Sequence, residues 1–492
     1  DETVRWGDTD GYNHVNNVIP DRRQNMLVPT DDNNPTGTKS VSDLAASDNH
    51  RFFQELVEDE VAANITGSYV FAKNKEEEYK GKLTLGYSGR FKKVDFKATQ
   101  FNFRINRRLV QPIVDQHKLD TYFTQNNLVN NLFKIETFRG DASTSNALDP
   151  QTYFGNQYIN GGFAEVQYKV SSKLTVVTGL RFEHIYQDIA WKTSLDPDGD
   201  KDAFAKFEFL PNASLKYELT EKQNLKVAAS KSYTLPQYKE RAPFQFEEVT
   251  QIKFGNPDLE LSTNYNLDAR WEYFPKSGEV ISFTGFGKII QNPINEVVVA
   301  SATNDISYVN TGKQAEVFGV EFELRKDIFS SEKEKGEAIL KSKLSAGFNT
   351  SYMYSSQDFD RFKVIKETNL NVNFTSQKGK LTGASDLILN ADVTFIKDFS
   401  KKSNLLGTIS YNYFSDRVYA IGSAGKGDLI DKGVGSLDVI LKTKLSKKVK
   451  LGLTIKNLLN PTVKRVQDIQ NVEVLSFKNG VNASFSLTYK LY

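Results

Sequence analysis

Four aspartates occupy alternate positions in one short stretch of the chain, where their type and spacing could do chemistry. They are Asp196, Asp198, Asp200 and Asp202 in the sequence DPDGDKD. Carboxylates at every second position can converge on a hard cation such as Ca²⁺. The glycine is not at the sixth position and no bidentate glutamate follows at the twelfth, so this is not an EF-hand loop. The stretch is interpreted either as a calcium site or as an ordinary solvated acidic loop.

A long segment from Arg108 to about Gln151 mixes aromatic rings with amide groups, a combination that could suit a sugar, a peptide or a ferric chelate. The candidate ligand-binding residues in this segment are Tyr122, Phe123, Asn126, Asn130 and Phe133, and residues of the same types are Asn127, Asn131 and Phe138. Amides and aromatic residues also make ordinary loops. The segment therefore offers candidate ligand contacts but leaves the substrate class open.

A search for catalytic constellations gives nothing. The four histidines are isolated from one another, at His14, His50, His117 and His184, and the sequence contains no H-E-x-x-H, G-x-S-x-G or P-loop motif. Acid pairs such as Glu247-Glu248 are interpreted as solvated loop charges, because no feature of the sequence identifies them as the carboxylate pair of a glycosidase. We expect a protein that is not an enzyme and that has no cofactor, apart from the calcium considered above.

Composition narrows the class of protein. Lys plus Arg (63) nearly balances Asp plus Glu (61), so there is no reason to expect a nucleic-acid partner. Mean hydropathy is -0.48, and no apolar run is long enough for a membrane-spanning helix. The absence of cysteine suits an oxidising compartment. The sequence begins at Asp1 without a signal peptide, which predicts a processed or truncated chain rather than a cytoplasmic one.

The elements that would position any site are strands, and Leu437 to Asn460 shows their pattern most clearly. Alternate residues are apolar in two runs, Leu437, Val439, Leu441 and Leu445 and then Val449, Leu451, Leu453 and Ile455. In the first run the charged residues Asp438, Lys442 and Lys444 occupy positions between the apolar ones. Side chains of a strand point alternately to its two faces, so one face is apolar and the other is polar. The short connector Ser446 to Lys448 predicts a hairpin.

The same pattern recurs along the chain and predicts about 15 strands, most of them 10 residues or longer. Short charged turns are expected near residues 75, 172, 221, 276, 333, 400 and 447, and loops of a dozen to over forty residues alternate with them. Residues 1–61 read as a long extracellular loop region, and residues 62–492 read as strands. Short turns on one side and long loops on the other are typical of a transmembrane barrel. We expect the short turns to face the periplasm and the loops 108–151 and 234–260 to face outward.

The predicted fold class is therefore all-β, a transmembrane antiparallel β-barrel with a polar lumen. An open soluble sheet or a propeller explains the pattern less well, because the meander is long and no blade repeat occurs. Charged residues in the lumen-facing register would meet water or a polar plug, and most would be solvated without individual roles. These lumen candidates are Glu165, Arg181, Lys216, Glu218, Asp268, Arg270, Glu272, Glu321, Glu323, Arg325, Asp438, Lys442 and Lys444.

Several motifs in order resemble a known family. They include GLRFEH from Gly179, YTLPQYKERAPFQFEEV from Tyr233, GNPDLEL from Gly255, NTGKQAEVFGVEFELRK from Asn310 and NLLNP from Asn457. From about Gly155 to the C-terminus the chain resembles the C-terminal barrel region of TonB-dependent outer-membrane receptors of Bacteroidetes type. The resemblance implies the outer membrane of a Gram-negative bacterium and energised uptake of a scarce nutrient such as a siderophore, glycan or peptide.

The same resemblance implies a plugged barrel of about 22 strands, of which this chain would supply about 15. The plug domain and the TonB-contacting segment are absent from this sequence, so we expect contact with the TonB system through that missing region. Outer-membrane lipid is the other expected partner, and a surface lipoprotein or other outer-membrane subunits are further candidates. An odd number of strands should not close into a barrel, so we expect the strand from Val481 to Tyr492 not to pair with the strand near Ile65. A scaffolding barrel in a larger complex and a passive porin remain the alternative functions.

Overall fold

A computed structural model describes residues 2–5, 27–29, 38–41, 50–73, 79–106, 113–115, 121–247, 251–300, 305–335 and 338–491. Its largest feature is a 19-stranded antiparallel sheet. Fifteen long strands form the meander of this sheet: β4 (His50–Lys73), β5 (Tyr79–Ile105), β9 (Gln151–Lys169), β10 (Leu174–Lys192), β11 (Asp200–Thr220), β12 (Gln223–Thr234), β15 (Ser262–Tyr273), β16 (Val280–Gln291), β19 (Gln314–Lys335), β20 (Ala338–Asp358), β22 (Leu387–Ser400), β23 (Ser403–Phe414), β26 (Val434–Lys444), β27 (Val449–Lys456) and β30 (Asn482–Tyr489). Within the described ranges no helix is long and apolar enough to cross a membrane.

The hairpin expected between Leu437 and Asn460 is confirmed as β26 and β27. Their register pairs Val439 with Ile455 and Leu441 with Leu453, so the apolar side chains of both strands share one face. The turn is closed by backbone hydrogen bonding from Leu445 to the Val449 carbonyl at 3.0 Å. Alternation in the sequence therefore gave the correct strands, faces and partner here.

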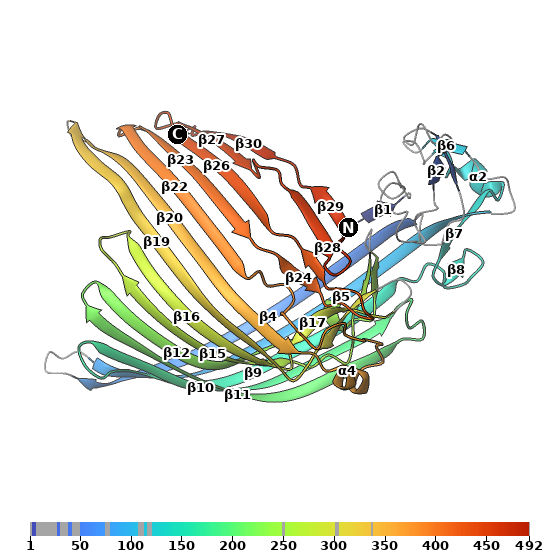
Figure 1. The fold of residues 1–492 in the computed structure, drawn as a ribbon, viewed down its shortest axis with the longest axis horizontal. Helices are drawn as coiled ribbons and strands as arrows, with labels where there is room; N and C mark the ends of the chain where they lie inside the picture. The colour runs from blue at the N-terminus through green and yellow to red at the C-terminus, as the bar shows by residue number, and fades with distance from the viewer. Residues whose placement is uncertain are drawn as a thin grey trace.

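The two ends of the sheet differ in their connections, as predicted. Short turns gather at the left and upper left of Figure 1, and the long connections gather at the right, so we name these the turn end and the loop end. The turn expected near residue 333 comes a few residues later, because β19 continues through most of the charged stretch to Lys335 and pairs there with β20. Alternating charges thus belong to strands that extend past the apolar band. The turn expected near residue 75 lies outside the described residues.

The first long strand begins earlier than the sequence pattern indicated. β4 starts at His50 and so includes residues 50–61, which had been assigned to the loop region 1–61 because that region shows little strand pattern. In the structure this stretch faces lysines of β5, with Asp59 opposite Lys93 and Glu60 opposite Lys92. Lys92 also forms an ion pair with Glu58. Cross-strand charge pairing therefore allows an acidic sequence to form a strand.

The sheet remains open between its first and last long strands. The sheet order places β30 next to β4, yet the register of β30 joins it only to β27 and the register of β4 joins it to β5 and, at its start, to β1 (Glu2–Arg5). No pair of residues between Ser484–Tyr489 and Ile65–Phe71 is hydrogen-bonded within the described strands. The expectation that these two strands do not pair is confirmed.

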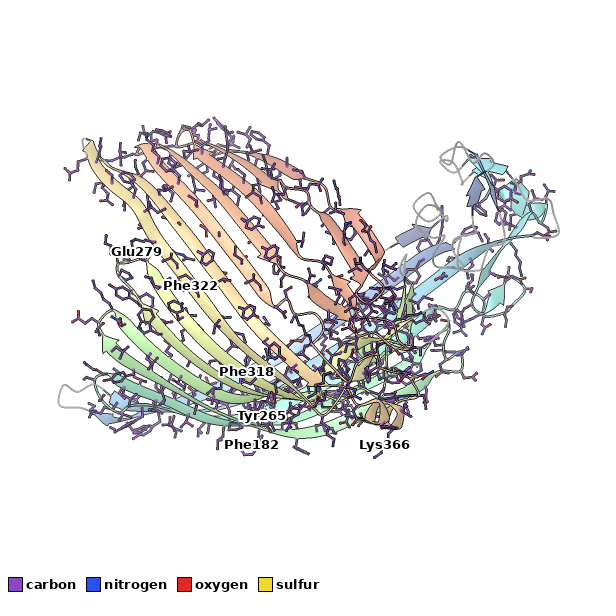
Figure 2. All side chains as sticks on the ribbon, in the orientation of Figure 1. Phe182, Tyr265, Glu279, Phe318, Phe322 and Lys366 are labelled. Carbon is purple, nitrogen blue, oxygen red and sulfur yellow. The ribbon has the colours of Figure 1, made fainter. Side chains whose placement is uncertain are left out.

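Side chains divide between an apolar outer face and a polar inner face. Phe182, Tyr265 and Phe318 project from the outer face in Figure 2, and they are 60%, 43% and 53% exposed. The inner face carries charged side chains such as Glu183 and Glu272, which are largely buried. An outward apolar band around a polar interior is the arrangement of a transmembrane barrel.

The long connections fold into small elements at the loop end. One four-stranded sheet contains β13 (Gln245–Glu247), β14 (Ile252–Phe254), β17 (Ile294–Val298) and β18 (Ile306–Asn310), and another contains β24 (Arg417–Ala420), β25 (Leu429–Asp431), β28 (Thr462–Gln467) and β29 (Val472–Lys478). With helix α4 (Arg361–Glu367) they form what we call the loop cap. Buried Val297, Val309, Val364, Val372, Val418 and Ile421 give the loop cap a hydrophobic core. The connections are therefore packed against one another rather than separately solvated.

The remaining elements are short. A three-stranded sheet contains β2 (Leu27–Pro29), β3 (Thr38–Val41) and β6 (Ile113–Asp115). The connection between β5 and β9 contains helix α2 (Gln125–Val129), β7 (Phe133–Thr137) and β8 (Gly140–Asp141), and it extends away from the sheet at the upper right of Figure 1. Helix α3 (Tyr238–Arg241) lies between β12 and β13, and β21 (Lys378–Gly379) pairs with the end of β20.

The two ends of the sheet give a test of orientation. Because the chain has no cysteine, a single introduced cysteine labels one position only. We expect Ile469→Cys, in the turn between β28 and β29, to react with a membrane-impermeant maleimide on intact cells. We expect Lys447→Cys, in the turn between β26 and β27, to react only after the outer membrane is permeabilised. The reverse pattern would invert the orientation.

Candidate functional site

The connection from Leu235 to Leu261 folds back against the inner face of the sheet near the loop end. Helix α3 begins this connection, and the Gln237 backbone N–H donates to Glu240 Oε2 at 2.8 Å, which caps the helix start. The helix is followed by the buried residues Ala242 and Phe244. This short helical turn directs one face of the connection toward β5, β9 and β10.

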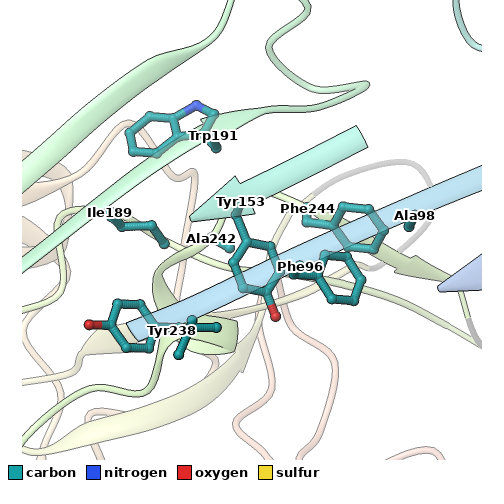
Figure 3. Close-up of a cluster of buried hydrophobic side chains, with 9 residues drawn as sticks. Phe96, Ala98, Tyr153, Ile189, Trp191, Tyr238, Ala242 and Phe244 are labelled. Atoms are coloured by element: carbon teal, nitrogen blue, oxygen red, sulfur yellow. The ribbon is translucent and has the colours of Figure 1, made fainter. Parts of the chain in front are cut away.

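An aromatic cluster holds the connection in place. Phe96 of β5 stacks on Tyr153 of β9, with ring centroids 4.5 Å apart, and meets Phe244 edge-on at 5.0 Å. Figure 3 shows Tyr238 and Ala242 in the same cluster, with Trp191 of β10 at its margin. Each aromatic side chain buries a large apolar area, so the cluster fixes the connection to the barrel wall.

Arg241 joins the same connection to the wall by polar contacts. Its guanidinium is fully buried, pairs with Asp202 of β11 and donates to Gln187 Oε1 of β10 at 3.2 Å. It also donates to the Pro257 carbonyl at 3.2 and 3.3 Å. Burial lowers the pKa of the Arg241 guanidinium, and the charge of Asp202 opposes this change. Two of these contacts join the connection to β10 and β11, and the two to Pro257 hold its two halves together.

A cavity of about 740 Å³ lies beside this cluster, between the connection and the inner face of β4, β5 and β9. Its apolar lining includes Phe96, Tyr153, Tyr238 and Phe246, and its polar lining includes Gln54, Glu55, Glu58, Arg90, Lys92, Gln157, Gln187, Gln237 and Lys239. The volume is within the range of small-molecule sites, and an apolar lining with a few polar groups is typical of them. This cavity is the candidate functional site.

The charges of the cavity are largely matched within the protein. Lys92 pairs with Glu58, and Arg90 donates to Gln157 Oε1 at 3.1 Å. Lys239 instead lies over the Phe246 ring, 4.7 Å from its centroid, and is exposed. The site therefore presents aromatic faces, amides and one accessible ammonium group, which can contact a compact ligand carrying both apolar and polar atoms.

The Tyr238 hydroxyl is a further polar group of this cavity. The nearby Gln187 amide donates to the Pro236 carbonyl at 3.2 Å and accepts from Arg241. No residue of the described chain forms a hydrogen bond with the Tyr238 hydroxyl. Burial raises the pKa of this hydroxyl, so it stays neutral and can donate a hydrogen bond. A buried donor without a partner favours a bound polar group in the cavity.

The ligand candidates of the segment 108–151 lie away from this cavity. Tyr122, Phe123 and Phe133 pack on one another, with centroids 5.1 to 6.4 Å apart, and Phe133 is buried. Asn126 of α2 and Asn130, which caps the C-terminal end of α2, are exposed, and Asn130 Nδ2 donates to Asn126 Oδ1 at 3.4 Å. The aromatic rings form a small core of the connection, while the two amides face solvent. Ligand binding by these five residues stays a prediction.

The four aspartates are not brought together. Asp196 accepts from Trp191 Nε1 at 2.9 Å and from the Gly199 N–H at 3.1 Å, while Asp202 pairs with Arg241. Asp198 lies in the connection between β10 and β11, and Asp200 is the first residue of β11. Throughout the described ranges no three His, Asp or Glu side chains gather so that they could hold a metal. Asp196 closes its turn and Asp202 attaches the connection through Arg241, and calcium binding by the stretch stays a prediction.

The lumen candidates form an ion-pair network on the inner face. Arg270 contacts Glu272 at 2.9 Å and Glu323 at 3.1 Å, and Lys226 contacts Glu272 at 2.9 Å. Lys216 pairs with Glu218 at 2.8 Å, Arg181 pairs with Glu183, and Asp438 Oδ1 accepts from the Asn457 N–H at 2.8 Å. The cross-strand register places the other candidates on the same face, namely Glu165, Asp268, Glu321, Arg325, Lys442 and Lys444.

Sequence reasoning missed the role of Arg241. The motif that contains it, YTLPQYKERAPFQFEEV, had been noted for the family resemblance, without a role for Arg241. A charged residue flanked by buried Tyr238 and Phe244 within one helical turn was the available signal, since a buried arginine needs a partner.

Comparison with known proteins places the chain in a wider context. A family model described as "TonB dependent receptor-like, beta-barrel" matches residues 4–458, and no curated protein matches the chain. Similar solved structures include the ferric yersiniabactin uptake receptor FyuA from Yersinia pestis, with TM-score 0.53 and 11% identity over 92% of this chain and 55% of that one. The siderophore receptor PiuA from Acinetobacter baumannii has TM-score 0.51 and 11% identity, over 93% and 58%. The copper transporter OprC has TM-score 0.54 and 10% identity, over 90% and 58%. This chain thus spans little more than half the length of each of them. Sequence identities this low support a similar fold and nothing further.

Proposed function

The chain belongs to the TonB-dependent receptor-like β-barrel family and is an outer-membrane protein of a Gram-negative bacterium, and from this membership we propose that it is the wall of a receptor for energised nutrient uptake. The family match over residues 4–458 carries the proposal. The polar inner face and the folded loop cap support it. An open pore would not need a connection that is held by aromatic and ionic contacts across its inner wall.

The cavity beside α3 is proposed as the ligand contact on the barrel side. Its volume of about 740 Å³ suits a compact nutrient rather than a long polymer. Two of the similar structures are named as a ferric yersiniabactin uptake receptor and a siderophore receptor, so metal chelates are the first ligands to try. Oligosaccharides and short peptides have the same mixture of apolar and polar atoms and follow them.

The direct test is nutrient-limited growth of a deletion strain. We expect the strain to lose growth on one class of nutrient, and we expect the wild-type gene to restore it only while the TonB system is intact. Restored growth without TonB would indicate a passive porin. Unchanged growth on every nutrient, together with subunits that co-purify with the protein, would indicate a scaffold.

A substitution in the cavity tests the position of the site. Lys239→Ala removes the accessible ammonium group and should lower the uptake rate at limiting nutrient by about tenfold, because a lost contact of about 1.4 kcal/mol changes affinity by that factor. Lys464→Ala is the matched control, since Lys464 pairs with Glu473 at 2.7 Å on the loop cap and does not line the cavity. Equal uptake by the two variants would move the site elsewhere.

A further inference from the structure

Helix α4 of the loop cap has an unusual outer surface. Phe362 is 84% exposed, more than any other large apolar side chain in the described chain, and Ile365 is 47% exposed. The opposite side of the helix is anchored, because Val364 is buried in the core of the loop cap. The exposed apolar pair is therefore held in a fixed direction, away from that core.

Positively charged residues flank this pair on both sides. Successive residues of an α-helix are about 100° apart around its axis, so the outer surface reads in order Arg361, Ile365, Phe362 and Lys366. Neither Arg361 nor Lys366 has an ion-pair partner among the described residues, whereas Lys363 pairs with Glu367 and Asp358 pairs with Lys378 at 2.9 Å. Figure 2 shows Lys366 projecting from the same edge of the molecule as Phe182 and Tyr265, two residues of the apolar outer face.

The position of α4 in the chain places it close to the edge of the apolar band. Phe318 of β19 and Tyr354 of β20 are opposite each other on the outer face and are 53% and 56% exposed. Beyond them the outward positions of β20 are Ser356 and Asp358, so the apolar band ends at Tyr354. From Tyr354 to the strand end at Asp358 the rise is about 14 Å along the strand, or about 10 Å in height for a strand tilted by about 45°. Two residues separate that strand end from the start of helix α4 at Arg361, which places the helix at the level of lipid headgroups.

We propose that α4 docks on the membrane surface, with Phe362 and Ile365 entering the headgroup layer and Arg361 and Lys366 binding anionic, phosphate-bearing lipid headgroups. An apolar stripe bordered by Lys and Arg is the composition of helices that lie in this interface. The two cations supply charge complementarity, and the helix lies about 10 Å above the end of the apolar band of β19 and β20, where headgroups are expected. Through Val364 the contact ties the loop cap to the membrane.

Site-directed spin labelling of the whole protein tests the proposal. The chain contains no cysteine, so Ile365→Cys carries a single nitroxide and leaves Phe362 in place. Tyr354→Cys is the lipid control, and Ile469→Cys, in a turn of the loop cap where Ile469 is 62% exposed, is the water control. In vesicles of phosphatidylcholine and phosphatidylglycerol, the label at 365 should be several-fold less accessible to an aqueous nickel reagent than the label at 469. Adding Phe362→Ala should reduce this protection.

The charges are tested by lipid composition. Protection at 365 should weaken in vesicles of phosphatidylcholine alone, and Arg361→Gln with Lys366→Gln should remove the difference between the two lipid mixtures. Equal nickel accessibility at 365 and 469 would overturn the proposal. Protection independent of phosphatidylglycerol would overturn the assignment of the two cations.

Discussion

Replacing Arg241 with methionine should lower the free energy of unfolding by about 3 kcal/mol and release the connection from Leu235 to Leu261 from the barrel wall. Methionine fills a similar volume, so the loss comes from the ion pair with Asp202 and from the hydrogen bonds to Gln187 and Pro257. Asp202 is 44% exposed, so water can solvate its carboxylate once the arginine is gone. The expected loss of stability is therefore at the lower end of the range of about 3 to 5 kcal/mol for breaking a buried ion pair. The Gln187 and Pro257 oxygens are left without their donor.

Urea unfolding of the purified protein, followed by tryptophan fluorescence, measures this loss, and limited proteolysis between residues 235 and 261 reports the release. Arg241→Lys should fall between the wild type and the methionine variant, because a lysine keeps the charge but cannot donate to three partners in a fork. Arg417→Met is the matched control. Its pair with Asp431 is 3.1 Å long, but Arg417 is 50% exposed, so the expected loss is about 1 kcal/mol or less. If both arginines gave the same loss, Arg241 would not be the anchor of the connection.

Arginine at Leu215 should impair assembly of the barrel, whereas arginine at Ser214 should be tolerated. Leu215 lies on the outer face of β11, opposite Val176 of β10 and Val227 of β12, and it is 45% exposed. A cation facing lipid near the midplane costs about 2 to 4 kcal/mol. Ser214 points to the inner face, on the same side of β11 as Lys216 and Glu218. An arginine there would be solvated and would lie near other charged side chains.

The yield of folded protein in outer-membrane fractions and the urea midpoint of each variant measure this difference. The two positions are adjacent in one strand, so strand propensity and distance from the turn are nearly matched and only the face differs. Equal losses from the two variants would contradict the division between lipid and lumen.

The strands, their faces and the difference between short and long connections could be predicted from the sequence, because each depends on neighbours a few residues apart. In β26 and β27 the alternation of apolar and charged residues was sufficient, since the pleat alone decides which side a residue faces. The limits of strands were less certain. The acidic start of β4 and the charged end of β19 form strands only because a partner strand supplies the matching charges.

The site required the tertiary structure. Arg241 meets residues 39 and 54 positions away, and Gln251 Nε2 donates to the Tyr419 hydroxyl 168 positions away, so no local pattern could indicate either contact. The aspartate stretch shows the converse, because its regular spacing was visible but its carboxylates turned to Trp191 and Arg241. Which residues face lipid and which face the lumen followed from the alternation of residues, because it is a property of each strand alone. Only the folded chain decided which loop residues meet, because their contacts depend on the curvature and register of the whole sheet.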